Sequence, residues 1–327
     1  MAIKTTQDQR LIQMSTPLAK DFLLIDRLRC TEGLNQLFQI DLDILHEEQV
    51  EGFETTPVDP TALLGNPITV SAHQHGGITR YFHGICVRFS HGSRTQRFSS
   101  YKAVLRPKVW MLTQVHQSRI FQNETIPDIL DKVLKDYDVE NIIDKSGFKP
   151  RNYCVQYRES DWDFASRVME EEGIYYYFEH TKNGHRLILG NPPRTHKDTP
   201  TSPRITYALE RSEISDKWIS SIYQWRQEDS MFTGKSQLRD YHFQQPTYDH
   251  EVNETSVFDV GKNKELESYD WPGGFAKRFD AIDPGGAENN SRPDPIVPRR
   301  NRTVLLRQRQ LHPADKLASG TPANCAL

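Results

Sequence analysis

The stretch Phe38–Ile44 alternates apolar and polar side chains without interruption, as Phe-Gln-Ile-Asp-Leu-Asp-Ile. Successive side chains of a β-strand point to opposite faces, so the four apolar residues would share one face and the three polar residues the other. An α-helix repeats every 3.6 residues and would scatter the same residues around its surface. The pattern therefore predicts a strand that buries one face and exposes the other.

Further strand-like segments lie on both sides of this one. They are Phe22–Ile25, Ile68–Val70, Arg80–Phe89 and Tyr101–Trp110. Gly33 and Asn35 occupy the expected turn before Phe38, and His75-Gly76-Gly77 is typical of a hairpin turn. Thr61–Leu64 is expected to form one helical turn that ends at Gly65. Residues 1–110 are therefore expected to form a β-barrel or a strongly curved sheet.

Two helices are predicted in the next part of the chain. Thr125 is suited to cap the first helix, with Asp128 three residues on. An apolar stripe at helical spacing follows this cap, made of Ile126, Ile129, Leu130, Val133 and Leu134. Ser160 and Asp163 repeat the capping pattern for the second helix, and Gly173 is suited to end it. Strand-like segments on both sides of the second helix predict an α+β unit between β-rich parts.

Length and composition narrow the class of protein. The chain has 327 residues, which suits two or three domains. Its net charge of −3 offers no general attraction for nucleic acid or an anionic membrane. An arginine-rich stretch at residues 299–309 is interpreted as a solvated basic linker. No N-terminal signal and no apolar run of membrane-spanning length is apparent. The four cysteines are widely spaced and are interpreted as reduced thiols, namely Cys30, Cys86, Cys154 and Cys325.

Residue patterns that would carry chemistry are weak in this sequence. His73 and His75 would share a strand face, but no third metal ligand is suggested by spacing. Carboxylates crowd the second predicted helix, where Asp161 and Asp163 suit the positive end of the helix dipole. The run Glu170–Glu172 opposes the dipole at the other end and is either solvated or paired across an interface. We predict no catalytic, cofactor-binding or metal-binding residue, no cofactor, and no enzyme activity.

Several motifs together point to a known family. The most specific runs from Tyr153 through Arg158-Glu159-Ser160-Asp161-Trp162 to Glu172-Gly173-Ile174-Tyr175-Tyr176-Tyr177-Phe178. Other motifs occur in the same order as in the family, namely Arg80–Ile85, Tyr101–Trp110, Ser118–Gln122 and Tyr269–Gly273. Taken together they resemble the N-terminal, phage-baseplate-hub-like region of the VgrG family of type VI secretion spike proteins.

This resemblance implies a mainly β fold with an α+β insertion and two barrel-like β domains. The implied domains are a first barrel at 1–110, the insertion at 111–195, a second barrel at 196–282, and a polar linker at 283–327 toward a needle region. Strand-like pieces at 214–226, 236–243 and 267–271 would belong to the second barrel. Pro284–Arg302 departs from the family pattern as an unusually polar insertion.

The resemblance also implies a structural role. Three copies would form a hub that adapts a threefold needle to a hexameric, Hcp-like tube protein, with baseplate proteins and effectors as further partners. Only the needle region would contact a target membrane. The protein would stay in the cytoplasm until the type VI apparatus exports it. Two alternatives stay open: the hub of a tailed phage or extracellular contractile particle, and a cell-wall hydrolase or effector-bearing spike.

Overall fold

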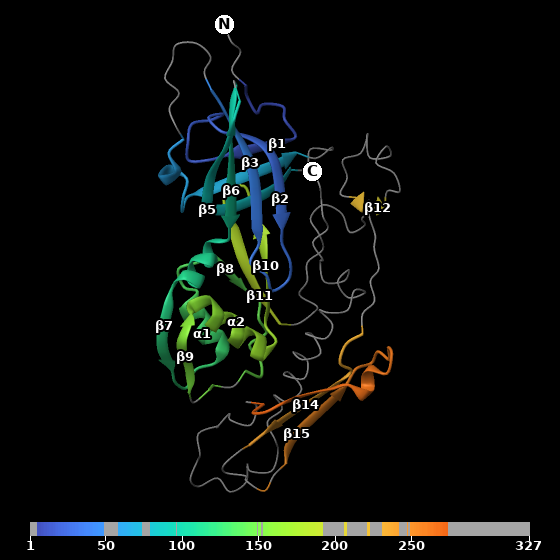
Figure 1. Ribbon diagram of the computed structural model, residues 1–327. Coiled ribbons are helices and arrows are strands. Elements are labelled where there is room, and N and C mark those ends of the chain that lie inside the picture. The colour runs from blue at the N-terminus through green and yellow to red at the C-terminus, as the bar shows by residue number, and fades with distance from the viewer. Residues whose placement is uncertain are drawn as a thin grey trace.

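The computed structural model describes residues 5–48, 58–73, 79–95, 97–148, 150–151, 153–191, 206–207, 221–222, 231–241, 247 and 249–273. These residues are mainly β-structure with two α-helices (Figure 1). The predicted hairpin turn at His75–Gly77 and the polar stretch after residue 283 lie outside the described residues.

The N-terminal part forms a six-stranded antiparallel sheet, here called the curled sheet. Its strands are β1 (Ile12–Ser15), β2 (Leu24–Thr31), β3 (Gln39–Glu47), β4 (Pro67–His73), β5 (Thr79–Arg94) and β6 (Phe98–Arg106). They lie side by side in the order β1-β4-β5-β6-β3-β2. Figure 1 shows that the sheet curls around itself, as the sequence predicted for a barrel-like unit. A short 3-10 helix at Pro60–Ala62 forms the predicted helical turn, and Gly65 follows it with a φ of 76°.

The apolar core of the curled sheet lies on the face that the alternating pattern predicted. Phe38 and Ile40 are 0% exposed, and Leu42 and Ile44 are 1% exposed. Burying one such side chain contributes roughly 1.5–3 kcal/mol relative to leaving it in water. Gly84 on β5 lies beneath this core, and a Cβ there would come within 3.3 Å of the Phe38 ring. Glycine at this position therefore allows β5 to approach the core closely.

A buried glutamine links the two edge strands where the sheet curls. The side-chain oxygen of Gln7 accepts hydrogen bonds from the backbone N–H of Met14 on β1 (3.0 Å) and of Ile25 on β2 (3.3 Å). Its amide nitrogen donates to the Met14 carbonyl at 3.1 Å. Gln7 is only 4% exposed, so this side chain satisfies backbone groups that direct strand pairing leaves open.

The second part of the chain is the insert, residues 108–191. It contains a 3-10 helix (Lys108–Gln114), β7 (His116–Phe121), α1 (Ile126–Val133), β8 (Val139–Asn141), β9 (Cys154–Ser160), α2 (Asp161–Glu172), β10 (Tyr175–His180) and β11 (His185–Gly190). β7 pairs with β9, and β10, β11 and β8 form a three-stranded sheet. The predicted strand Tyr101–Trp110 is wrong at its end: β6 stops at Arg106, because Pro107 lacks an N–H and the 3-10 helix follows.

Both helices begin as the sequence predicted, and α2 also ends as predicted. The Thr125 hydroxyl accepts from the Asp128 N–H, and the Ser160 hydroxyl accepts from the Asp163 N–H. Gly173 ends α2 in the left-handed region with φ 68°, where glycine is favoured. The predicted apolar stripe of α1 is buried, and it packs with α2 residues such as Phe164 and Val168 in one core.

A separate small sheet lies toward the C-terminus of the described residues. It consists of β14 (Lys235–Asp240), β15 (His250–Thr255) and β16 (Glu267–Asp270), with β14 in the centre. β14 and β16 overlap two predicted strand-like pieces, whereas β15 was not predicted. Two-residue strands β12 (Thr206–Tyr207) and β13 (Ser221–Ile222) pair with each other. The second barrel at 196–282 stays a prediction.

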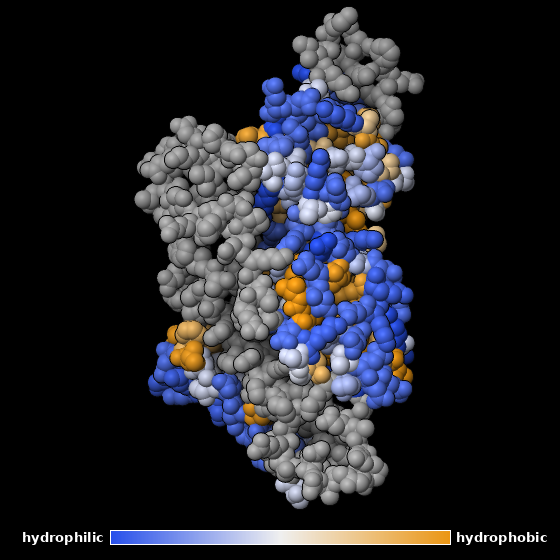
Figure 2. Space-filling view, turned by 180° about the vertical axis from the view of Figure 1, so that it is seen from behind, coloured by the Kyte–Doolittle hydropathy of each residue, from blue (hydrophilic) through white to orange (hydrophobic). Residues whose placement is uncertain are grey.

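The surface of the described residues is mainly polar. Figure 2 shows mostly hydrophilic residues from behind, with hydrophobic residues gathered in local patches. Neither described helix is both long and apolar enough to cross a membrane.

Candidate functional site

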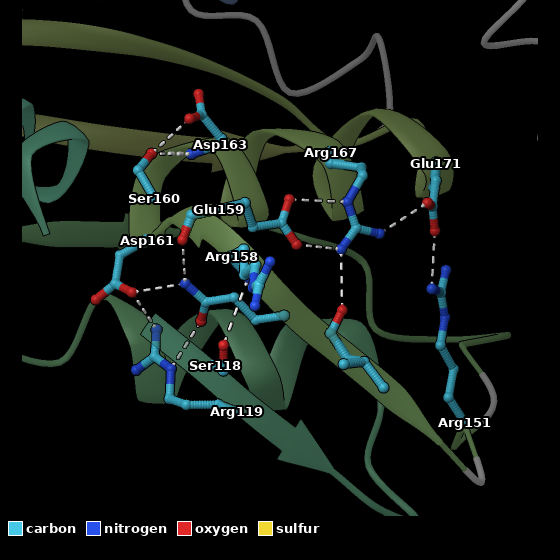
Figure 3. A network of polar contacts seen from close by, with 12 residues as sticks. Ser118, Arg119, Arg151, Arg158, Glu159, Ser160, Asp161, Asp163, Arg167 and Glu171 are labelled. Carbon is cyan, nitrogen blue, oxygen red and sulfur yellow. Dashed lines mark hydrogen bonds and ion pairs between the residues drawn. The ribbon is translucent and has the colours of Figure 1, made fainter. Parts of the chain in front are cut away.

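A polar network lies beneath the ribbon formed by β7 and β9, within the motif that carried the family resemblance. Asp161 is 4% exposed and is the first residue of α2. The Arg119 Nη2 donates to Asp161 Oδ1 at 2.7 Å, and the Gln156 amide donates to the same oxygen at 2.8 Å. Arg119 Nε also donates to Gln156 Oε1 at 2.8 Å, which closes a triangle of contacts (Figure 3). This triangle fixes both strands of the ribbon to the start of α2.

The carboxylates at the start of α2 have structural partners. Asp163 Oδ2 accepts from the Ser160 hydroxyl at 2.7 Å, so the cap and its third residue bond reciprocally. Asp161 and Asp163 both lie in the first turn of α2, where the helix dipole favours negative charge. The sequence interpretation of these two carboxylates is therefore confirmed.

The acidic end of α2 is paired within the chain. Arg151 Nη1 lies 2.8 Å from Glu171 Oε2, and its Nη2 lies 2.7 Å from Glu172 Oε1. Burial alone would lower the pKa of Arg151, but the two carboxylates outweigh it and raise that pKa above its usual value. Arg167 adds a salt bridge to Glu159 on β9 at 2.6 Å. Neither expected alternative, solvation or pairing across an interface, describes Glu171 and Glu172, because both pair with Arg151 of the same chain.

Three histidines meet where the curled sheet contacts the insert. His83 belongs to β5, His180 to β10 and His185 to β11. The backbone N–H of Lys108 donates to His185 Nε2 at 2.8 Å, so a neutral His185 carries its proton on Nδ1. That N–H donates to His83 Nδ1 at 2.8 Å. These contacts were not predicted, because His83 and His185 are 102 residues apart in sequence.

Burial favours the neutral form of His83 and His185 at this histidine junction. Burial, together with His83 and His180 nearby, lowers the pKa of His185 to about 3. Burial and the neighbouring His180 also lower the pKa of His83. Burial by itself would raise the pKa of Glu32, but the hydrogen bond from His180 and the positive charge of Arg80 hold that pKa below its usual range. The contact between the two parts therefore favours uncharged His83 and His185.

A cavity of about 430 Å³ lies beside the junction, lined in part by His83, His185, Phe178, Lys108 and Tyr137. Both nitrogens of His185 already have hydrogen-bond partners, so this imidazole offers no free lone pair to a ligand. His185 is therefore not available as a general base in this cavity.

The remaining residues considered from the sequence are His73, His75 and the four cysteines. His73 Nδ1 lies 3.1 Å from the Thr79 hydroxyl, while His75 lies outside the described residues. Within the part of the chain that the structure describes, no group of three His, Cys, Asp or Glu side chains is arranged to hold a metal ion. Cys30, Cys86 and Cys154 form no disulfide with one another, whereas Cys325 lies outside the described residues.

Residues 31–305 match the sequence pattern of the phage tail baseplate hub family. The chain belongs to the phage tail baseplate hub family. It is 34% identical over 277 residues to the type VI secretion system spike protein VgrG1b of Pseudomonas aeruginosa, covering 84% of this chain and 36% of that protein. It is 32% identical over 274 residues to VgrG1a of the same organism, covering 83% of this chain and 41% of that protein.

Two further similarities are to a toxin and to a protein of known structure. The chain is 32% identical over 180 residues to the actin cross-linking toxin VgrG1 of Vibrio cholerae, covering 54% of this chain and 16% of the toxin. The solved structure of the E. coli c3393 protein, described as a type VI secretion component similar to phage T4 gp27 and gp5, has a TM-score of 0.49 and 22% identity, covering 61% of this chain and 53% of that one. The chain spans 36–41% of the length of the Pseudomonas spike proteins VgrG1b, VgrG1c and VgrG1a.

Proposed function

We propose that this chain forms the hub portion of a type VI secretion spike, a structural part of a contractile injection apparatus. The observation that carries the proposal is the match to baseplate hub proteins over residues 31–305, together with 34% identity to a spike protein over 84% of the chain. The site geometry supports a structural role, because the motif residues around α2 bond to one another and fix strands in place.

The proposed assembly is a homotrimer. Three copies would place two barrel-like domains each, residues 1–110 and 196–282, around a ring that matches a hexameric Hcp-like tube protein. The insertion at 111–195 and the linker at 283–327 complete the proposed domain plan. Baseplate proteins and effectors would be further partners. The protein would wait in the cytoplasm and leave the cell through the type VI apparatus when it fires.

The test is genetic and biochemical. Deleting the gene should abolish release of the tube protein into the medium, and the wild-type gene should restore it. Native mass measurement of the purified full-length protein should give three copies. Unchanged tube-protein release in a strain without any other spike gene would overturn the proposal.

A second candidate is the hub of a tailed phage or an extracellular contractile particle. The observation that favours it is the matched family itself, which is defined by phage tail baseplate hubs. Particles sedimented from lysed cultures would separate the two. A phage hub would be found in intact tails, whereas a secretion spike would appear in the medium of unlysed cells together with the tube protein.

An effector-bearing spike is a third candidate, favoured by the similarity to the actin cross-linking toxin VgrG1. Only 16% of that toxin is covered, so the similarity does not extend to most of its length. Expressing residues 1–327 in target cells, with an empty vector as the control, would test whether this chain is toxic.

A further inference from the structure

The outer side of the β7–β9 ribbon is apolar and exposed. On β9 and the residue before it, Cys154 and Gln156 point inward, while Tyr153, Val155 and Tyr157 alternate outward. Ile120 on β7 is paired directly with Val155. Tyr157 is 66% exposed, Tyr153 and Ile120 are 57% exposed, and Val155 is 36% exposed. We call these four residues the ribbon face.

The ribbon face is held in a fixed shape. Its inner side is bonded through Gln156 to Arg119 and Asp161, so the two strands cannot shift freely relative to α2. A two-stranded ribbon in water has little stability of its own, so this anchoring determines its position. A preformed aromatic surface loses little conformational entropy when a partner covers it.

The basic side chain of Arg158 lies at the edge of the ribbon face. Arg158 follows Tyr157 in the left-handed region with φ 52°, and its guanidinium lies over the Tyr157 ring at 5.3 Å. A left-handed arginine is uncommon, so the local backbone directs this side chain at some energetic cost. Among the described residues no carboxylate forms an ion pair with Arg158, in contrast to Arg119, Arg151 and Arg167. Its positive charge is therefore available to a partner.

A second exposed surface of opposite charge lies on the sheet β15-β14-β16. All four residues of its edge strand β16 are exposed. Tyr269 is 54% exposed and Trp271 is 58% exposed, and both belong to the Tyr269–Gly273 motif. The segments 231–241 and 249–273 contain eight Asp or Glu against four Lys or Arg, a net charge of −4. We call this surface the acidic sheet.

Resting on the trimer under Proposed function, we propose that the ribbon face of one copy packs against the acidic sheet of the next copy. A closed ring of identical chains joined head to tail needs two unlike, complementary patches on each chain. The ribbon face and the acidic sheet are two such patches. Tyrosine, tryptophan and arginine are the residues that most often dominate binding at interface centres. Arg158 would meet the excess negative charge of the neighbouring sheet.

The contact can be tested in the full-length protein with a photoreactive side chain. Tyr157 is replaced by p-benzoylphenylalanine, and ¹⁴N- and ¹⁵N-labelled protein are mixed, allowed to assemble and irradiated. We expect cross-linked peptides that join residue 157 of one isotope to residues 249–273 of the other. The matched control carries the same photoreactive residue at Leu11, which is 47% exposed and directly precedes β1, and should give no such link.

A charge reversal gives an independent measurement on the same contact. Arg158→Glu should reduce the yield of the inter-chain cross-link at least tenfold at low salt, and less at high salt, because salt screens exposed charges. Arg27→Glu is the control, since the side chain of Arg27 is 74% exposed on the curled sheet.

The outcomes separate this inference from the function proposed above. A trimeric native mass with cross-links that stay within one isotope, reach another surface or do not form would overturn the inference and leave the hub function standing. A strictly monomeric native mass would count against the hub function itself. Cross-links to a different protein in a cell lysate, in place of a second copy, would also overturn the inference.

Discussion

The curled sheet and the insert are stabilised by different means. In the curled sheet, an alternating strand pattern places Phe38, Ile40, Leu42 and Ile44 in one apolar core. The insert has an apolar core too, but the ends of α2 depend on buried ion pairs that reach distant segments, such as Arg119–Asp161. The hydrophobic pattern thus sets the register of the strands in the curled sheet. In the insert, charge and hydrogen bonding set the position of α2 relative to distant segments.

This difference has a consequence for assembly. A sheet that buries one continuous face tolerates exposure of its other face to water. The β7–β9 ribbon has only two strands, so its outer aromatic face stays in place because the Arg119–Gln156–Asp161 triangle holds the inner face. The polar network of the insert therefore serves to present a surface, while the apolar core of the sheet serves to stabilise the fold.

The largest effect of a substitution on stability is expected at Phe38, which contacts both regions. The Phe38 ring lies 5.0 Å from the Phe178 ring and 4.6 Å from the His180 ring, both in the insert. Phe38→Ala should lower the free energy of unfolding by about 3–5 kcal/mol, because it leaves a cavity at the junction. Urea denaturation followed by fluorescence and circular dichroism measures this loss.

Leu11→Ala is the control for that change, since Leu11 is 47% exposed, and it should stay within about 0.5 kcal/mol of wild type. A Phe38→Ala variant that loses less than about 1 kcal/mol would contradict the cavity argument. If only the curled sheet lost stability, the junction would not couple the two regions.

The second prediction concerns the insert alone. Arg119→Met leaves the buried Asp161 carboxylate without its cation and should cost about 3 kcal/mol. Hydrogen exchange should speed up in β7 and β9, with little change in β3 and β6. Lys145→Met is the control, because Lys145 and Asp131 form an exposed pair of the kind that contributes at most about 1 kcal/mol. Equal losses from both variants would remove the distinction between buried and exposed charge.

The third prediction is a pH dependence of the junction. The pKa of His185 in the folded protein, about 3, lies below the ordinary value of 6.5, so the unfolded chain binds more protons between these two pH values. Stability should therefore fall as pH decreases below 6.5, by about 2 kcal/mol between pH 6.5 and 5 for this histidine alone. His83 adds to the loss, because its pKa is also lowered. The other titratable or charged groups that face the junction are His180, Lys108, Arg80 and Glu32.

His185→Gln tests that assignment, since glutamine keeps an acceptor for the Lys108 N–H but does not titrate. The variant should show a flatter decrease of stability between pH 7 and 5 than wild type. His116→Asn, an exposed histidine on β7, should leave the wild-type slope unchanged. The same slope in His185→Gln and wild type would show that this imidazole is not the group that titrates.

The elements that the sequence predicted best are those whose signals are local. The strand at Phe38–Ile44, the caps Thr125 and Ser160, and the helix end at Gly173 each depend on residues within a few positions of one another. The family resemblance also rested on local motifs, and the match over residues 31–305 agrees with it. The end of β6 was missed although Pro107 marked it.

Contacts between distant segments could not be predicted in this way. The histidine junction brings together residues of β5, β10 and β11, and no spacing in the chain links them. Arg151 lies 20 and 21 residues before the two glutamates that it pairs with, so the sequence indicated solvation or an interface and not a partner in the same chain. The ribbon face was hidden for the same reason, since its exposed side depends on which face of β9 meets α2.

The smallest effect is expected at the helix caps, where the insert uses local hydrogen bonds. Ser160→Ala removes the bond from the Asp163 N–H, which is 3.0 Å long and partly buried, and should cost about 1 kcal/mol. Thr125→Ala removes a longer, exposed bond of 3.4 Å at α1 and should cost about half as much. Thermal denaturation of both variants in parallel measures the difference.

Because Ser160 also precedes Asp161, its loss should loosen the ribbon face as well as α2, which Thr125→Ala should not do. Faster hydrogen exchange in β9 for Ser160→Ala alone would support this link between cap and surface, and equal exchange in both variants would refute it.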